Sequence, residues 1–385
     1  MIFDKMILNE KVWEMLSNSF ANNKIPNAFI FSGEDGVGKE AHAIEFSALL
    51  NCRRIDGEKF PCGDCRSCLK IKSFQHEEIH FIHPAPSPKN KTEMILDQKT
   101  IDELNKNYKL KSSSPYHKIS IGNSMTIPIA SIRSLKKKLY YSKSDENWSV
   151  VIIFDSEKLC IPKAESANSL LKILEEPPER TLFILITSNI NLLIPTIQSR
   201  CQKIYFKNLS ISDLREYSVT HLNDNLTDEI IDLSSGSLSK LLNNTNQNKA
   251  EQFKKLLNYF YNNEISSIEK VLSSLNKIKM NDKNEFKDYL NFIKISAKDL
   301  YLLSSAINNN SISYNFLRDD YEIIIKSFPN ANWSGIIQLI DDSILNFSRN
   351  INMSLEVYAL MVNVRSCLQG KRVNRFHQQI GNEIK

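Results

Sequence analysis

The chain has 385 residues, a length that suggests two or three domains. Its 49 basic and 44 acidic residues give a net charge of +5, which is too small to indicate nucleic-acid binding by itself. No apolar run approaches the roughly 18 residues needed to span a bilayer, and the first residues lack the pattern of a secretory signal. We therefore expect a cytoplasmic protein.

A glycine-rich loop near the start of the chain is the first sign of specific chemistry. Residues 28–31 are apolar and predict a buried strand, and residues 41–50 predict a helix. Between them lies a loop with three glycines and a lysine: Gly33, Gly36, Gly38 and Lys39. Strand, loop and helix in this order are the context of a phosphate-binding P-loop. One position departs from the pattern, because Glu40 stands where a Ser or Thr would ligate Mg²⁺.

Four of the seven cysteines cluster directly after this helix, at Cys52, Cys62, Cys65 and Cys68. Clustered cysteines in a cytoplasmic chain indicate a metal site rather than disulfides. Zinc takes four thiolates at about 2.3 Å, and close Cys-x-x-Cys pairs fold readily around it. We predict a structural zinc site; free thiols or a disulfide pair are the alternative.

The next segments carry weaker signals. Three histidines surround the short apolar stretch 79–82, but their irregular spacing favours ordinary histidines over a second metal site. Residues 84–124 are rich in Pro, Lys, Asn and Ser, which predicts an insertion or mobile loop. Residues 129–139 have helical apolar spacing, with lysines 136–138 mostly on the other face. Those lysines either form a solvated face or contact a phosphate backbone.

The apolar run that ends at Asp155 is the strongest strand signal in the sequence. In a P-loop protein, an Asp at that place holds the water shell of Mg²⁺. A hydrolysing protein of this kind carries a Glu next, whereas here Ser156 follows and Glu157 comes one step later. Because side chains alternate along an extended strand, we do not expect Glu157 at the place that Ser156 holds.

Two later motifs closely resemble the bacterial DNA polymerase III clamp-loader subunits. Residues 166–178 read Ser-Ala-Asn-Ser-Leu-Leu-Lys-Ile-Leu-Glu-Glu-Pro-Pro, and residues 199–201 read Ser-Arg-Cys. The cysteine module after the P-loop helix is similar to that of the family too. The resemblance covers residues 1–245 well and is weaker beyond them, although residues 350–356 look like a final helix of the delta-prime branch.

The resemblance implies an α/β P-loop fold of the AAA+ class followed by helical domains. Residues 1–208 would form the AAA+ domain, with the zinc module at 52–68 and the polar insertion at 84–124. Residues 209–245 would form a small helical lid domain. Residues 246–385 would form an all-α collar domain for oligomerisation.

The family has an ATP-hydrolysing gamma/tau branch and a delta-prime branch that generally does not hydrolyse ATP. Glu40, Ser156 and Ser239 depart from the ATPase pattern, and Ser239 stands where the ATPases carry a sensor arginine. A second negative charge near the phosphates costs roughly 4 kcal/mol at about 4 Å and an effective dielectric of 20. These departures favour a delta-prime role without ATPase activity of its own. Whether the loop with Lys39 and Asp155 still binds nucleotide stays open.

The resemblance assigns Arg200 of the Ser-Arg-Cys motif as an arginine finger that reaches in trans to ATP on a neighbouring gamma/tau subunit. A structural salt bridge is the alternative. The implied partners are gamma/tau and delta subunits in a hetero-oligomeric ring, the sliding clamp, and primed DNA, mostly through the complex.

As part of the DNA-directed DNA polymerase (nucleotidyltransferase) holoenzyme, the chain would support ATP-dependent loading of the clamp during DNA replication. One alternative is a gamma/tau-like ATPase. The other is a P-loop protein that keeps nucleotide or zinc for regulation outside replication.

Overall fold

The structure is a computed structural model of the whole chain. It describes residues 1–54, 59–86, 94, 96–122, 124, 126–141, 147–161, 163–222, 226–243, 248–261, 283–305, 312–347 and 353–371. Two compact units are present: Met1–Asn225 with Gly236–Leu242, and Leu226–Ser235 with Asn243–Lys385. The segment 209–245, predicted as a lid domain, contributes residues to both units. The three-domain boundaries remain a prediction.

The first unit is built around a five-stranded sheet whose paired strands are all parallel. Its strands in spatial order are β2 (Ile79–Ile82), β3 (Ser149–Ile153), β4 (Thr181–Thr187), β1 (Ala28–Ser32) and β5 (Gln202–Tyr205). β1, β3 and β4 are buried along their whole length, as expected for a parallel sheet covered on both faces. The predicted α/β fold with buried strands is confirmed, and the structure shows that the paired strands are parallel.

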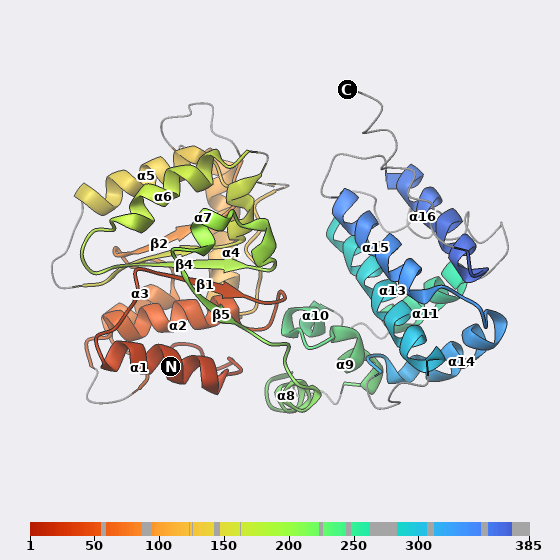
Figure 1. Cartoon of the computed structure of the whole chain (residues 1–385). Helices are drawn as coiled ribbons and strands as arrows, with labels where there is room; N and C mark the ends of the chain where they lie inside the picture. Colours follow the sequence, from red (N-terminus) through yellow and green to blue (C-terminus); the bar gives the residue numbers. More distant parts are fainter. Residues whose placement is uncertain are drawn as a thin grey trace, which may run out of the picture. The chain divides into compact units, whose positions relative to one another are not determined.

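Helices cover both faces of this sheet (Figure 1). Side chains of α1 (Glu10–Ala21), α2 (Lys39–Asn51) and α3 (Arg66–Lys72) share one core with alternate residues of the strands. The other core contains side chains of α5 (Ile129–Tyr141) and α6 (Glu165–Glu175). Residues of β1, β2, β3 and β4 therefore contribute to both apolar layers, whereas β5 contributes only Ile204, to the first.

Part of the predicted polar insertion is helical. α4 (Gln98–Ser113) begins at Asp97, whose side chain accepts a hydrogen bond from the Thr100 N–H. Residues 87–93, 95 and 123 of the insertion lie outside the described residues. The first unit also contains these shorter elements: η1 (Ser156–Cys160), η2 (Ile190–Leu192), α7 (Pro195–Gln198), α8 (Ile211–Tyr217), η3 (Ser218–Leu222) and most of α10 (Leu238–Asn243).

The described part of the second unit is helical, with one aromatic-rich core. Its elements are α9 (Asp228–Ser234), α11 (Asn248–Tyr261), α13 (Lys283–Ser304), η4 (Asn315–Leu317), α14 (Arg318–Ser327), α15 (Trp333–Phe347) and α16 (Met353–Leu368). The apolar side chains around Leu257 of α11 and Ile336 of α15 contribute to this core. Residues 350–352, the start of the predicted final helix, lie outside the described residues. None of the described helices has the length and apolar character needed to cross a membrane.

Candidate nucleotide and metal sites

The parallel sheet brings the predicted nucleotide-site residues to one end of its strands. The P-loop follows β1, and Asp155 lies just beyond β3. Ser188, which was not among the predicted site residues, directly follows β4. Carboxyl ends of parallel strands meet at one end of a sheet, which is where α/β folds bind ligands. Gly38 caps the start of α2 with a φ of 95°, a conformation that favours glycine.

Lys39, the predicted phosphate contact, is bound to its own loop. Its ammonium donates to the backbone oxygens of Gly33 and Glu34, the latter at 2.8 Å. The nearer Asp35 carboxylate oxygen lies 3.8 Å away. The side chain is only 4% exposed, and burial lowers the pKa of Lys39. Phosphate binding would require this ammonium to leave two carbonyl partners.

Glu40 has a lysine partner that sequence reasoning missed. The Lys111 ammonium, from α4, donates to the Glu40 carboxylate. It also donates to the backbone oxygens of Pro115 at 3.0 Å and His117 at 2.7 Å, and its side chain is fully buried. The extra negative charge of Glu40 is therefore balanced within the chain. No local spacing in the sequence relates residue 40 to residue 111.

Two lysines bind the Asp155 carboxylate. Lys158 Nζ lies 3.0 Å from one oxygen, and Lys118 Nζ lies 3.3 Å from the other. Lys118 also lies 2.6 Å from an Asp35 oxygen, so it links the P-loop to the end of β3. Burial alone would raise the pKa of Asp155, but the charges of Lys118 and Lys158 outweigh it and hold this pKa below its usual range. The group expected to hold the water shell of Mg²⁺ is ion-paired instead.

The chain beyond β3 turns earlier than expected. β3 ends at Ile153, Asp155 has a left-handed φ of 46°, and Ser156 begins the short helix η1. The premise of an extended strand through Asp155 is therefore wrong, because the left-handed residue redirects the backbone. Glu157 is buried, and its charge raises the pKa of Lys39 against the larger effect of burial.

Glu157 and Ser156 leave polar atoms without hydrogen-bond partners among the described residues. One Glu157 oxygen accepts from Ser188 Oγ at 2.9 Å, but the other has no partner. Ser156 Oγ, which is fully buried, also has none. A buried carboxylate oxygen without a donor is costly, so Glu157 is a functional candidate that the sequence reasoning set aside.

The start of α10 packs directly on the P-loop. Ser237 Oγ donates to the Asp35 backbone oxygen at 2.7 Å, and the Leu238 N–H donates to the Gly36 oxygen at 3.0 Å. A Cβ atom on Gly36 would lie 2.4 Å from Ser237 Oγ, so only glycine fits this contact. Ser239, at the predicted sensor position, donates to the Tyr116 backbone oxygen at 2.9 Å. Ser237 and Leu238 thus form hydrogen bonds with the P-loop itself.

Arg200 lies apart from these groups and forms an ion pair. One of its guanidinium nitrogens lies 2.5 Å from a Glu175 oxygen, and another donates to the Thr196 backbone oxygen at 2.9 Å. The side chains of Arg200 and Glu175 are 35% and 47% exposed. The salt bridge considered as an alternative therefore exists, but at a solvent-exposed place where such pairs are weak.

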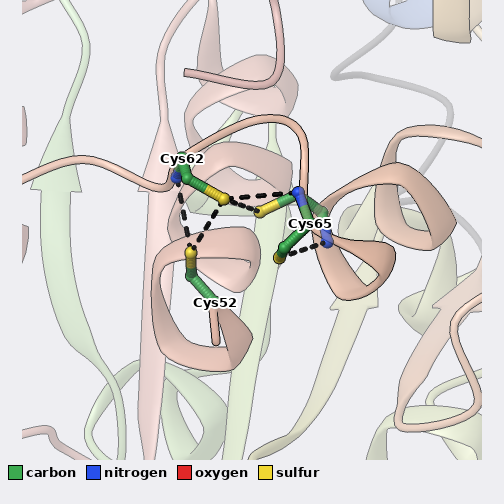
Figure 2. A group of neighbouring side chains, drawn as sticks. Cys52, Cys62 and Cys65 are labelled. Carbon is green, nitrogen blue, oxygen red and sulfur yellow. Dashed lines mark hydrogen bonds between the residues drawn. The ribbon is translucent and has the colours of Figure 1, made fainter. Parts of the chain in front are cut away.

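The four clustered cysteines converge as predicted. Figure 2 shows three of them, Cys52, Cys62 and Cys65, with their sulfur atoms close together. The sulfur atoms of Cys52, Cys62, Cys65 and Cys68 all lie within 4.8 Å of one another. Tetrahedral zinc with bonds of about 2.3 Å separates its ligand sulfurs by about 3.8 Å, so this arrangement fits a closed structural site. The donor set would hold the ion without leaving a position for a substrate.

Backbone groups support the thiolate form of Cys65, whereas burial raises the pKa values of Cys62 and Cys68. The Cys65 N–H points to Cys62 Sγ at 3.4 Å, and the Cys68 N–H points to Cys65 Sγ at 3.5 Å. Burial would raise the pKa of Cys65, but hydrogen bonds from the Arg53 and Cys68 N–H groups outweigh it and lower this pKa to about 6. Metal binding requires thiolates, so these donors favour it.

Comparison with known proteins identifies the family. The family described as DNA polymerase III, delta subunit, matches residues 8–210, more than half of the chain. The chain belongs to this family of DNA polymerase III clamp-loader subunits. The predicted family is confirmed.

Members of both branches are similar to this clamp-loader chain. Over 244 residues it is 26% identical to DNA polymerase III subunit delta' of Bacillus subtilis (strain 168), covering 63% of this chain and 58% of that protein. Over 368 residues it is 24% identical to subunit gamma/tau of Mycoplasma genitalium, covering 94% of this chain and 52% of that protein. The chain thus spans little more than half the length of these relatives.

Among solved structures, a gamma subunit-related protein from Thermotoga maritima matches with a TM-score of 0.37 and 17% identity, covering 92% of this chain and 99% of that one. Similarity at this level supports no inference about function. Because delta' and gamma/tau sequences both match the clamp-loader chain, its assignment to one branch stays a prediction.

Proposed function

We propose that this chain is the delta-prime subunit of a DNA polymerase III clamp loader, and that it does not hydrolyse ATP. It would support ATP-dependent loading of the sliding clamp on primed DNA. The observation that carries the proposal is that lysines neutralise the carboxylates of the nucleotide site. Glu40 pairs with Lys111, and Asp155 pairs with Lys118 and Lys158.

Mg²⁺-ATP needs the groups that these ion pairs occupy. A working P-loop site offers a hydroxyl to the metal, an Asp to its water shell and a free lysine to the phosphates. Here Glu40 replaces the hydroxyl, Asp155 is ion-paired, and Lys39 is bound to loop carbonyls. Nucleotide would also have to displace the contacts of Ser237 and Leu238 with the loop. In this proposal the P-loop serves as a structural scaffold and not as a nucleotide site.

Arg200 is proposed to act on ATP held by a neighbouring gamma/tau subunit. Its pair with Glu175 is solvent-exposed, and exposed pairs contribute only about 0–1 kcal/mol. The guanidinium can therefore be released to a phosphate at little cost. An arginine supplied in trans stabilises the charge that develops on the transferred phosphoryl group.

The proposed ring would include gamma/tau and delta subunits, with the helical second unit as its collar. α16 supports this proposal, since Leu355, Tyr358 and Val362 are 67%, 52% and 42% exposed. Their spacing places them along one side of the helix. Exposed apolar side chains in such a row are typical of a protein interface.

The test is reconstitution with gamma/tau and delta subunits. The isolated chain should neither hydrolyse ATP nor bind a fluorescent ATP analogue with Mg²⁺. Arg200→Ala should leave assembly intact, as measured by size exclusion with light scattering, and should lower the DNA-stimulated ATPase rate of the complex at least about tenfold. Lys207→Ala, which removes an exposed cation beyond β5, is the matched control. Equal rates for the wild type and Arg200→Ala would remove Arg200 from the mechanism.

A gamma/tau-like ATPase is the second candidate, and Glu157 favours it. This buried carboxylate has an oxygen without a described partner and acts electrostatically on Lys39. ATP hydrolysis by the isolated chain that is lost in Glu157→Gln would establish this candidate and refute the first. A chain that fails to assemble with either partner subunit would point to regulation outside replication.

A further inference from the structure

A polar pocket of about 300 Å³ lies far from the P-loop in the sheet topology. Glu78 and Asn147 line this pocket, and they come just before β2 and β3. The P-loop and Asp155 come after β1 and β3. Because all the paired strands are parallel, the pocket and the nucleotide site lie at opposite ends of the strands. The two sites are therefore separate.

The pocket is lined by cations of the cysteine module. Arg53 directly follows Cys52, Arg66 is the first residue of α3, and Lys70 lies one turn further along that helix. Lys70 pairs with Glu77. Within the part of the chain that the structure describes, neither the Arg53 nor the Arg66 guanidinium forms an ion pair. Glu78, whose carboxylate accepts a hydrogen bond from Ser149 Oγ at 2.7 Å, also lines the pocket. With three cations and two carboxylates in its lining, the pocket has a formal charge of +1, and both guanidinium groups lack an ion pair among the described residues.

Ser67 adds a hydroxyl donor between these cations. The Glu78 N–H donates to Nδ1 of His76 at 3.2 Å, so the proton of this neutral ring is on Nε2. Nε2 lies 3.0 Å from Ser67 Oγ and donates to it. Burial lowers the pKa of His76, in keeping with a neutral ring. The Ser67 hydroxyl proton then has no acceptor among the described residues and is available to a ligand oxygen.

We propose that this pocket binds a phosphate group of a nucleic-acid backbone. Guanidinium groups donate in a planar fork that matches the oxygens of a phosphate, and a buried hydroxyl adds a directional donor. Such contacts position a nucleic acid without reading its bases. The site goes beyond the delta-prime role, because it involves neither the P-loop nor Arg200.

An exposed lysine run on α5 favours a polyanion over an isolated phosphate as the ligand. Burial lowers the pKa of His80 of β2 to about 4, and the charge of Lys138 of α5 adds to this shift. His76, which contributes to this shift as well, lines the pocket. Lysines 136–138 are exposed. Ile82 of β2 packs against the core that contains Leu135 and Leu139 of α5, so α5 lies beside β2. The proposed backbone contact therefore includes the lysine run that the sequence left ambiguous.

Fluorescence anisotropy of the zinc-loaded full chain with a labelled single-stranded oligonucleotide tests the proposal, measured from low to moderate salt. Arg53→Ala/Arg66→Ala should weaken binding about tenfold or more. It should also lower the slope of log K against log[salt] by about 0.7 for each phosphate that the protein no longer neutralises. Ser67→Ala should weaken binding several-fold without changing the slope.

Arg54→Ala is the matched control. Arg54 belongs to the same module but pairs with Asp64 at 2.8 Å and does not line the pocket. It should change affinity less than twofold. Zinc content and circular dichroism of each variant show that the module is still folded.

Inorganic pyrophosphate serves as the competing anion. If pyrophosphate displaces the oligonucleotide from the wild type but not from the double variant, the result supports a phosphate site. Affinity and salt slope that are the same in the double variant and in Arg54→Ala overturn the proposal. Pyrophosphate binding that depends on the arginines, together with oligonucleotide binding that does not, overturns the assignment to nucleic acid.

Discussion

Glu40 and Lys111 show how one residue change in the P-loop is balanced by another residue of the fold. The Glu40 side chain is 20% exposed and Lys111 is fully buried, so each needs the other's charge. Removing one member of a buried pair leaves an uncompensated charge, whereas replacing both does not. The pair is therefore a structural unit rather than a remnant of metal binding.

Glu40→Ser alone should lower the free energy of unfolding by about 3 kcal/mol, because it leaves the Lys111 ammonium buried without a carboxylate. The double variant Glu40→Ser/Lys111→Met should recover most of this loss. Urea unfolding followed by circular dichroism measures both. Lys109→Met, at an exposed position of the same helix, is the control. If the double variant is as unstable as the sum of its single variants, the pair does not act as a unit.

Glu45 of α2 makes stability depend on pH. Its side chain is fully buried; one carboxylate oxygen accepts from the Ile2 N–H at 2.7 Å, and the other has no partner among the described residues. Burial raises the pKa of Glu45 to about 7, against the weaker effect of this hydrogen bond. Because the folded-state pKa exceeds that of the unfolded chain, its stabilisation is present below about pH 4.5 and is lost as pH rises through 7.

Glu45→Gln should therefore reduce the loss of stability between pH 5 and pH 8, by up to about 3 kcal/mol. Denaturant midpoints measured across that range test this expectation. Glu14→Gln changes an exposed carboxylate of α1 and should leave the pH dependence as in the wild type. A wild-type curve that is flat above pH 5 would contradict the assignment.

At the scale of elements, the cysteine module depends on a close contact with the start of the chain. Gly63, between two of the cysteines, has a φ of 80°, and a Cβ atom there would lie 2.6 Å from the Met1 backbone oxygen. The Met1 amino group also donates to the Pro61 oxygen at 3.0 Å. A side chain at residue 63 would therefore force apart the turn that gathers the thiols.

Purified protein should contain about one zinc per chain, and Cys65→Ser should lower both zinc content and melting temperature. Gly63→Ala should weaken zinc retention against a chelator about tenfold or more, as followed by a metal indicator. Gly122→Ala is a matched control, because its φ of 49° carries a similar backbone penalty but a Cβ there would meet no atom within 4 Å. Freshly purified wild type without zinc would refute the site.

At the scale of the whole molecule, assembly should depend on the exposed apolar row of α16. Tyr358→Glu/Val362→Glu should leave the melting temperature within a few degrees of the wild type, since both side chains are exposed. It should weaken assembly with gamma/tau and delta subunits about tenfold or more, as measured by analytical ultracentrifugation. Gln369→Glu, an exposed change just beyond this helix, should assemble normally. Normal assembly of the double variant would place the interface elsewhere.

The sheet and the cysteine cluster could be predicted because their signals are local. Strands buried on both faces are continuous apolar runs, as in β3 and β4, and ligands brought together by a tight turn lie close in sequence. The boundaries of strands were less predictable. The apolar run suggested an extended backbone through Asp155, but the left-handed backbone conformation of Asp155 ends it. The helix α4 was missed because its surroundings are polar and its apolar residues are few.

The sequence by itself determined the family, the P-loop, the three departures from the ATPase pattern, and the four clustered cysteines. Only the tertiary structure decided what those departures mean. Lys111 meets Glu40 across 71 residues, and Lys118 meets Asp35 across 83. The contact between Ser237 and Asp35 spans 202 residues. The periodicity of apolar residues predicts which side chains are buried. The partner of a buried charge depends instead on which residues are close together in the folded chain, and no local sequence pattern predicts that.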